Sequence, residues 1–260
     1  MLKVVVVTCG LHGMAANCLP ALVGRSSIKV VGVLHAIGSG TSRWRNLWRK
    51  FVKVLKIGIL GAWNGKRIRS WFGYDHGDLR EICQRNGIPF FDIVGLNSAA
   101  MVDKISELKP DLGLSLGNGF ISQRVFTLPR LGMVNIHSEI LPTYQNASRI
   151  IWPIYFNDPF TGFTIHEIER KIDAGRILYQ RKYPLRFYST LEETVRRNGA
   201  VVDKDIPAAL AEVCENIDML KLSSVQQGVG GSYTTPSIWQ FWRMCRNNAK
   251  FFRMQEDGLR

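Results

Sequence analysis

The chain has 260 residues, of which 46% are hydrophobic and 21% charged, so it has the composition of a globular protein and not of a disordered one. This length suits one main domain with appendages better than two domains of equal size. The formal net charge of +13 falls mostly before the first acidic residue, Asp75, with nine Lys and Arg residues between positions 43 and 69. Such a stripe suits nucleic acid, anionic lipid or a phosphorylated substrate.

Targeting and metal-binding signals are weak in this sequence. No uncharged apolar run reaches the ~18 residues of a membrane span, and the first residues, MLKVVVVTCGLHG, lack the basic region and cleavage pattern of a signal peptide. The five cysteines are scattered without a C-x-x-C pair, which disfavours a zinc site and a disulfide framework. We therefore expect a cytoplasmic protein without a bound metal.

The first half of the chain alternates predicted strands and helices. Apolar runs predict buried strands at 3–7, 29–34, 89–94 and 111–116, and helical patterns lie between them at 14–23, 78–87 and 98–108. This order predicts an α/β fold, with a Rossmann-like, open, mostly parallel twisted sheet covered by helices on both faces.

The second half has a different organisation. Strand-like segments at 133–137, 162–168 and 176–185 follow one another without long helices, and a helix is expected at 191–214. The glycines of 226–232 indicate a flexible join. We expect one domain over 1–215, carrying a basic insert at 40–72, and a C-terminal tail at 216–260.

The insert contains a basic amphipathic helix. In RWRNLWRKFVKVLK, basic residues fill one face while the other carries the apolar residues Trp44, Leu47, Trp48, Phe51 and Leu55. Segment 238–254 has a similar mixture of aromatic and basic residues. The simpler interpretation is that both helices pack their aromatic faces on the domain. The alternative is docking, on a membrane surface as a peripheral contact or on a protein partner such as a homodimer mate.

The turn CGLHG follows the first strand, at the edge where open α/β sheets usually bind ligands. Gly10, His12 and Gly13 are therefore candidate binding residues. The turn is not G-x-G-x-x-G, and no acidic residue ends the second strand, so NAD binding is disfavoured.

A stronger signal lies in GMVNIHSEILP, where Asn135 and His137 are two residues apart on a strand and share one face. A neutral histidine accepts a proton, and an amide donates to a carbonyl oxygen that gains negative charge. An isolated N-x-H is more often structural. The segment TGFTIHEIERKIDAGRIL then carries Asp173, 36 residues after His137.

Together these motifs resemble the formyltransferase family, which includes glycinamide ribonucleotide, methionyl-tRNA and sugar N-formyltransferases. The family carries N-x-H, L-L-P, T-G-x-T-x-H and D-x-G at similar spacing, and the resemblance is close over residues 112–185. It implies the formyltransferase fold, 10-formyltetrahydrofolate as the formyl donor, a small-molecule amine as the acceptor, and no metal. By this resemblance Asn135 would bind the formyl oxygen, His137 would handle the proton, and Asp173 would support His137.

The resemblance also implies the binding sites. The pterin would bind the backbone of the loop 168–173 against apolar residues, and the acceptor would lie near the CGLHG turn. The candidate pterin-binding residues are Phe120, Ile121, Leu141, Ile168, Glu169 and Ile172. His166 matches the T-x-H position of the family, and a structural role is favoured for it.

The chain departs from the family pattern after His137. The family often has H-P-S-L-L-P followed by R-G or K-G, whereas this chain has HSEILP followed by Gln145 and Asn146. Because Asn tolerates positive φ, Asn146 can preserve the turn. Glu139 either holds the acceptor through its amine or a hydroxyl, or is a solvated or salt-bridged carboxylate.

The chemical class of the acceptor is inferred by excluding the acceptors of other family members. After position 214 too few residues remain for the extra domain of methionyl-tRNA enzymes, so no nucleic acid is expected, and glycinamide ribonucleotide enzymes lack the insert. An amino sugar on a nucleotide or a lipid phosphate, as in polysaccharide biosynthesis, remains, and its phosphate would explain the basic stripe. A 10-formyltetrahydrofolate hydrolase and a non-enzymatic binding protein are the alternatives.

Overall fold

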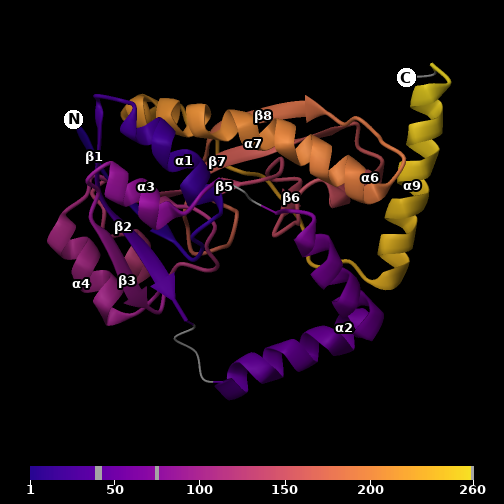
Figure 1. The fold of residues 1–260 in the computed structure, drawn as a ribbon, viewed down its shortest axis with the longest axis horizontal. Coiled ribbons are helices and arrows are strands. Elements are labelled where there is room, and N and C mark those ends of the chain that lie inside the picture. Colours follow the sequence, from indigo (N-terminus) through magenta and orange to yellow (C-terminus); the bar gives the residue numbers. More distant parts are fainter. Residues whose placement is uncertain (39–42, 74–75, 259–260) are drawn as a thin grey trace.

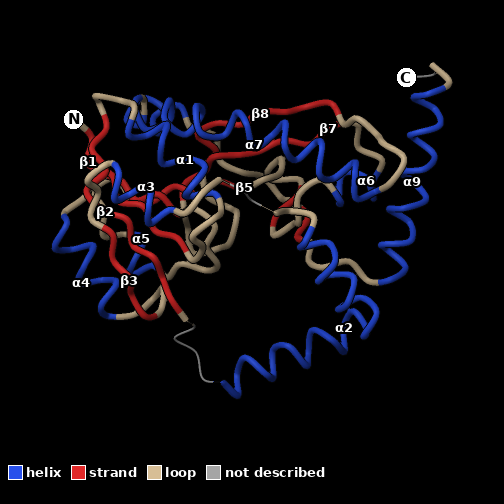
Figure 2. Tube along the Cα trace, in the orientation of Figure 1, coloured by secondary structure: helices blue, strands red, loops and turns tan. Residues whose placement is uncertain are grey.

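The computed structural model describes the chain except for residues 39–42, 74–75 and 259–260. Its centre is a seven-stranded sheet with the order β3-β2-β1-β4-β5-β7-β8 (Figures 1 and 2). The strands are β1 (Leu2–Thr8), β2 (Ile28–Ile37), β3 (Phe90–Val94), β4 (Leu112–Ser115), β5 (Met133–His137), β7 (Phe160–Glu167) and β8 (Ile177–Pro184). The first five are parallel, and β7 and β8 are each antiparallel to the preceding neighbour.

Helices cover both faces of this sheet, as the alternation in the sequence predicts, so the expected fold class is confirmed. The helices are α1 (Met14–Val23), α3 (Leu79–Arg85), α4 (Ala99–Leu108), α5 (Gln123–Phe126) and α7 (Leu191–Glu215). Because side chains alternate along a strand, Val4 and Val6 of β1 enter the core cluster shared with α1 and α7. Val5 and Val7 enter the opposite cluster, shared with α4 and α5.

A third core cluster joins the insert to the C-terminal segment. It is formed by α2 (Arg43–Ser70), α6 (Ile151–Phe156), the start of α7, and α9 (Ile238–Glu256). Ile68 and Trp71 come from the insert, while Met244 and Phe251 come from α9, and all four are buried. The C-terminal segment, with α8 (Ile217–Ser223) before it, is therefore part of this core. The domain boundary near 215 remains a prediction.

Two of the three glycines of 226–232, Gly230 and Gly231, are packed closely, whereas Gly228 has open space around it, so the flexible join that the glycines predict does not extend over 230–232. A Cβ at Gly230 would lie 1.9 Å from the carbonyl oxygen of Pro142, so no side chain fits there. The next residues form β9 (Gly231–Ser232), which pairs with β6 (Tyr144–Gln145). These glycines allow two backbones to approach, so in this segment they indicate contact and not a linker.

Helix α2 has two halves with different surroundings. It breaks at Gly58, whose φ of 73° and ψ of 165° are not helical. After the break, Gly61 and Gly65 pack against Pro236 and Thr235 just before α9. Before the break, the apolar residues at helical spacing are exposed, so the expectation that this face packs on the domain is wrong. Among the described helices, none is both long and apolar enough to cross a bilayer.

Candidate active site

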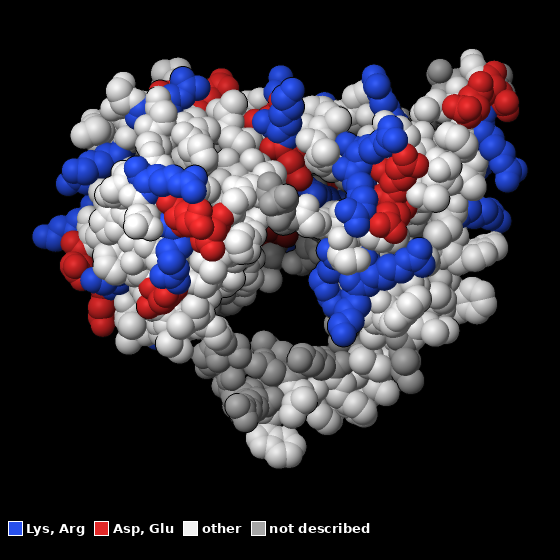
Figure 3. Space-filling model, viewed as in Figure 1, with Lys and Arg blue, Asp and Glu red and all other residues white. Residues whose placement is uncertain are grey.

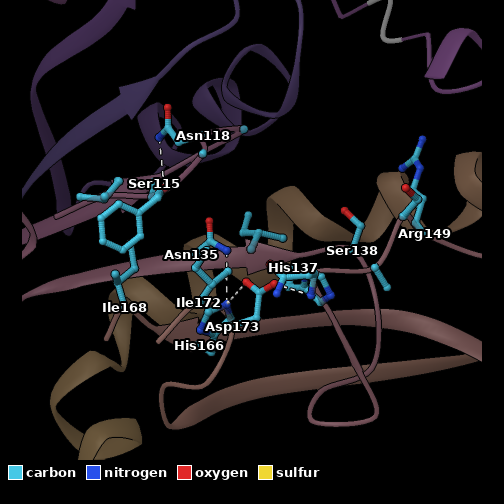
Figure 4. Close-up of a pocket in the computed structure, with 18 of the residues that line it drawn as sticks. Ser115, Asn118, Asn135, His137, Ser138, Arg149, His166, Ile168, Ile172 and Asp173 are labelled. Atoms are coloured by element: carbon cyan, nitrogen blue, oxygen red, sulfur yellow. Dashed lines mark hydrogen bonds and ion pairs between the residues drawn. The ribbon is translucent and has the colours of Figure 1, made fainter. Parts of the chain in front are cut away.

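A cavity of about 440 Å³ opens at the carboxyl ends of β4 and β5 (Figure 4). Its wall comes from the end of β4, the residues after it, β5, the turn after β5, the end of β7 and the loop before β8. The polar side chains Asn135, His137, His166 and Asp173 all line it. A cavity of this size suits a small organic ligand.

Asn135 and His166 lie on neighbouring antiparallel strands and form a direct pair. They are opposite each other in the register of β5 and β7. The amide nitrogen of Asn135 lies 3.2 Å from Nε2 of His166, whose Nδ1 lies 2.8 Å from the backbone oxygen of Glu167. Since a carbonyl oxygen only accepts, Nδ1 carries the proton and Nε2 accepts from Asn135. Burial lowers the pKa of His166, which agrees with this neutral form.

His137 is held in the opposite tautomer. Its Nε2 donates to the backbone oxygen of Tyr144 at 2.7 Å, so in the neutral ring Nδ1 has the free lone pair. This Nδ1 lies 3.5 Å from Oδ2 of Asp173. The geometry therefore makes Nδ1 the basic atom of His137 and places a carboxylate beside it, ready to stabilise the charged ring.

Asp173 lies between the two histidines, as Figure 4 shows. Its Oδ1 is 3.7 Å from Nε2 of His166, and its Oδ2 accepts a hydrogen bond from the backbone nitrogen of Asn146 at 2.9 Å. Asp173 and Asn146 have positive φ, 53° and 55°, so the expectation that Asn146 preserves the turn is confirmed. A Cβ at Gly175 would meet the backbone oxygen of Glu167 at 1.9 Å, so glycine is required there.

The expected pterin-binding residues divide into two groups. Phe120, Ile121, Ile168, Glu169 and Ile172 line the cavity. Leu141 does not line it; its side chain is buried, and its backbone bonds to Thr164 and Gln180. The binding roles of all six residues stay predictions.

The expected acceptor residues lie beside the cavity and do not line it. Gly10 and Gly13 flank the turn, and Nδ1 of His12 bonds to the backbone oxygen of Gly77 at 3.2 Å. Residues 117–119 line the cavity and the thiol of Cys9 lies against Gly119, and the contact of Gly10, His12 and Gly13 with an acceptor stays a prediction.

Residues that the sequence pattern did not assign to the site include Arg69, Phe72 and Arg149, all of which line the cavity. Arg69 and Phe72 come from the end of the insert. The Arg149 guanidinium lies 4.9 Å from the Phe72 ring centre and pairs with Asp203 of α7. The basic stripe was a signal for Arg69, but spacing alone does not say which of its members reaches a cavity.

The family model described as formyl transferase matches residues 77–210, about half of the chain. The chain belongs to the formyl transferase family. Asn135, His137 and Asp173 lie inside the matched region, while α2 and α9 lie outside it. The resemblance stated from the sequence motifs is thus confirmed.

Similar proteins share this part of the chain. A methionyl-tRNA formyltransferase of Roseiflexus castenholzii is 40% identical over 108 residues, which are 41% of this chain and 34% of that protein. The chain thus spans only about a third of the length of the curated relatives that it matches.

Solved structures of formyl transferases share the fold. A phosphoribosylglycinamide formyltransferase of Anaplasma phagocytophilum has a TM-score of 0.57 at 17% identity, covering 83% of this chain and 87% of that one. A sugar N-formyltransferase of a Shewanella species has a TM-score of 0.55 at 14% identity, covering 90% and 77%.

Within this formyl transferase domain Glu139 is buried completely and does not line the cavity. Its carboxyl accepts hydrogen bonds from the backbone nitrogens of Ile150 and Ile140 and from the hydroxyl of Thr161. A group without exposed surface cannot contact an acceptor, so the expected substrate-binding role, like the solvated alternative, is corrected. Burial raises the pKa of Glu139 to about 8 in spite of these donors.

The raised pKa predicts a pH-dependent stability. The unfolded state ionises Glu139 near pH 4.5 and the folded state near 8, so its contribution is complete below 4.5 and is lost as the pH rises through 8. Between these values we expect the free energy of unfolding of wild type to fall, relative to Glu139→Gln, by up to about 5 kcal/mol. Urea unfolding of both proteins at several pH values measures it, and a constant difference across this window would contradict the burial argument.

Proposed function

We propose that this protein transfers a formyl group from 10-formyltetrahydrofolate to a primary amine. The observation that carries the proposal is the convergence of Asn135, His137 and Asp173 on one cavity, where the carboxylate of Asp173 lies beside His137 and His166 links it to the amide of Asn135. Amine attack on a formyl carbon requires these three kinds of group. The family match supports the same reaction class.

Each side chain has a step that fits its contacts. When bound, the donor supplies a formyl carbon attached to a nitrogen that can leave. Asn135 has a second amide N–H besides the one bonded to His166, and this N–H donates to the formyl oxygen as negative charge develops. Nδ1 of His137 accepts the proton of the attacking amine, and Asp173 stabilises the charged ring. His137 then returns this proton to the leaving nitrogen, which balances the reaction.

The loop between β7 and β8 is suited to the folate. No described residue accepts a hydrogen bond from the backbone N–H groups of residues 169–172, which are therefore available to a ligand. Ile121, Ile168 and Ile172 supply apolar wall beside these polar groups. A flat heterocycle with polar edges needs this combination.

For the acceptor we propose an amino sugar that carries phosphate, on a nucleotide or on a lipid. Arg69 lines the cavity with an exposed guanidinium, and Phe72 lies next to it. Arginine binds phosphate oxygens through paired N–H donors. Both residues come from a segment outside the matched family region, so this side of the cavity is where an acceptor preference would be built.

The reaction is tested by incubating the protein with 10-formyltetrahydrofolate and one amine at a time. The candidates are a nucleotide-linked amino sugar, a polyprenyl-phosphate-linked amino sugar, glycinamide ribonucleotide and methionyl-tRNA. We expect turnover that depends on an amino sugar. Equal turnover without any amine would identify a hydrolase, and turnover with another acceptor alone would contradict the sugar proposal.

Single substitutions test the assigned roles. We expect Asn135→Ala, His137→Ala and Asp173→Ala each to lower kcat by about a hundredfold or more, because they remove groups that act in the transition state. Asp103→Ala is the control, since Asp103 is exposed on α4 and does not line the cavity, and its rate should be unchanged. A His137→Ala protein that is folded and fully active would contradict the mechanism.

The acceptor proposal has its own variant. Arg69→Gln should raise the KM of a phosphorylated amino sugar by about tenfold while leaving kcat nearly intact, because a phosphate contact binds ground and transition states alike. Lys66→Gln is the control, as Lys66 is an exposed cation of the same helix that does not line the cavity. Equal KM values for the two variants would show that Arg69 does not bind the acceptor.

A further inference from the structure

The first half of α2 carries a row of large apolar side chains in solvent. Trp44 is 82% exposed, and Leu47, Trp48, Phe51 and Leu55 are each more than half exposed. They recur every three or four residues, so they share one face of the helix. The rings of Trp48 and Phe51 lie 5.9 Å apart, in contact with each other. Soluble proteins rarely leave such a continuous apolar face uncovered without using it.

The same helix is strongly basic. All nine cations between positions 43 and 69 belong to α2, and no acidic residue occurs before Asp75. The spacing of Arg49, Lys53 and Lys56 corresponds to the side of a helix away from Trp44. On the face drawn in Figure 3, the described part of α2 shows no acidic atoms, and Lys and Arg atoms gather beside the opening next to it.

Tryptophan is concentrated at this end of the molecule. Of the seven tryptophans in the chain, five are exposed, and these five all belong to α2 or α9. On α2 they are Trp44, Trp48 and Trp63, and on α9 they are Trp239 and Trp242 near its start. Trp favours the boundary between lipid and water, because its ring is apolar and its N–H is polar.

We propose that the first half of α2 docks on an anionic lipid bilayer, lying in the plane of the interface. Its apolar face would enter the headgroup boundary while the cations bind lipid phosphates. A second copy of the chain fits this face less well, because it would bring the same dense positive charge to the contact. Nucleic acid would neutralise the cations but would leave Leu47 and Leu55 in water.

The docking helix is held to the catalytic body. After Gly58, the second half of α2 packs through Gly61 and Gly65, and Trp71 just after the helix is buried. Arg69 and Phe72 at the end of this segment line the cavity. From Leu55 to Arg69 the helix rises at most about 20 Å. A docked molecule would therefore hold the cavity near the bilayer surface. The docking proposal does not depend on the proposed formyl transfer, because it concerns a different surface.

Vesicle sedimentation tests the proposal with the full chain. We expect wild type to sediment with vesicles of equimolar phosphatidylcholine and phosphatidylglycerol at low salt, and to bind phosphatidylcholine alone more weakly. The triple variant Trp44→Ser, Trp48→Ser, Phe51→Ser should bind the anionic vesicles at least about tenfold less tightly, because it lacks most of the apolar area of this face. The triple variant Arg49→Gln, Lys53→Gln, Lys56→Gln should bind the anionic vesicles about a hundredfold less tightly, because it lacks three cations that bind lipid phosphates.

The controls separate docking from general effects. Met219→Ser, Leu222→Ser removes exposed apolar area from α8 and should bind vesicles as wild type does. Asp173→Asn should also bind normally, so loss of activity and loss of docking are distinguishable. The proposal would be overturned if wild type failed to sediment with anionic vesicles, or if the Trp44→Ser, Trp48→Ser, Phe51→Ser variant bound them as wild type does. It would also be overturned if sedimentation velocity showed a wild-type dimer that this variant abolishes.

Discussion

The site depends on the hydrogen bonds that the buried carboxyl group of Glu139 makes with the chain around it. It binds the backbone at both ends of the turn after β5, at Ile140 and Ile150, and the hydroxyl of Thr161 on β7. Ile150 has a φ of 69°, which is costly for a β-branched residue, and its backbone N–H is satisfied by this carboxyl. The turn that Glu139 closes supplies the two backbone groups that orient His137 and Asp173.

Two backbone groups of this turn hold the side chains of His137 and Asp173 in place. The carbonyl of Tyr144 selects the tautomer of His137, and the N–H of Asn146 holds one carboxylate oxygen of Asp173. Neither contact uses the side chain of the turn residue, so the turn can vary in sequence if its path is kept. This explains how Asn146 can stand where relatives often have glycine while the carboxylate keeps its place.

Much of the sheet could be predicted from local periodicity in the sequence, whereas the expected roles of Asn135, His137 and Asp173 come from the resemblance of their motifs to the formyltransferase family. Period-two spacing in β5 assigns Asn135 and His137 to one face. The same rule would also assign Glu139 to that face, but β5 ends at His137 and the chain turns, so Glu139 enters the core. Helical spacing likewise shows which residues of α2 share a face and cannot show whether the chain covers that face. Arg69 reaches the cavity only through the path of the insert, which no local pattern encodes.

Segments outside the matched family region complete the site and the surface around it. The insert supplies Arg69 and Phe72, and α9 supports the insert through a shared core. The residues proposed to carry the chemistry thus lie inside the matched family region, while those proposed to bind the acceptor lie outside it. On the proposed function, this division would allow one reaction to be combined with different acceptors by changing the flanking segments.

The central claim is that backbone contacts fix opposite tautomers in the two histidines of the site, which makes Nδ1 of His137 the base. Nitrogen NMR of protein labelled at histidine, with signals assigned through His137→Asn and His166→Asn, measures this most directly. In the neutral rings we predict the proton of His137 on Nε2 and the proton of His166 on Nδ1. A neutral His137 that carries its proton on Nδ1 would have no lone pair toward Asp173 and would contradict the account.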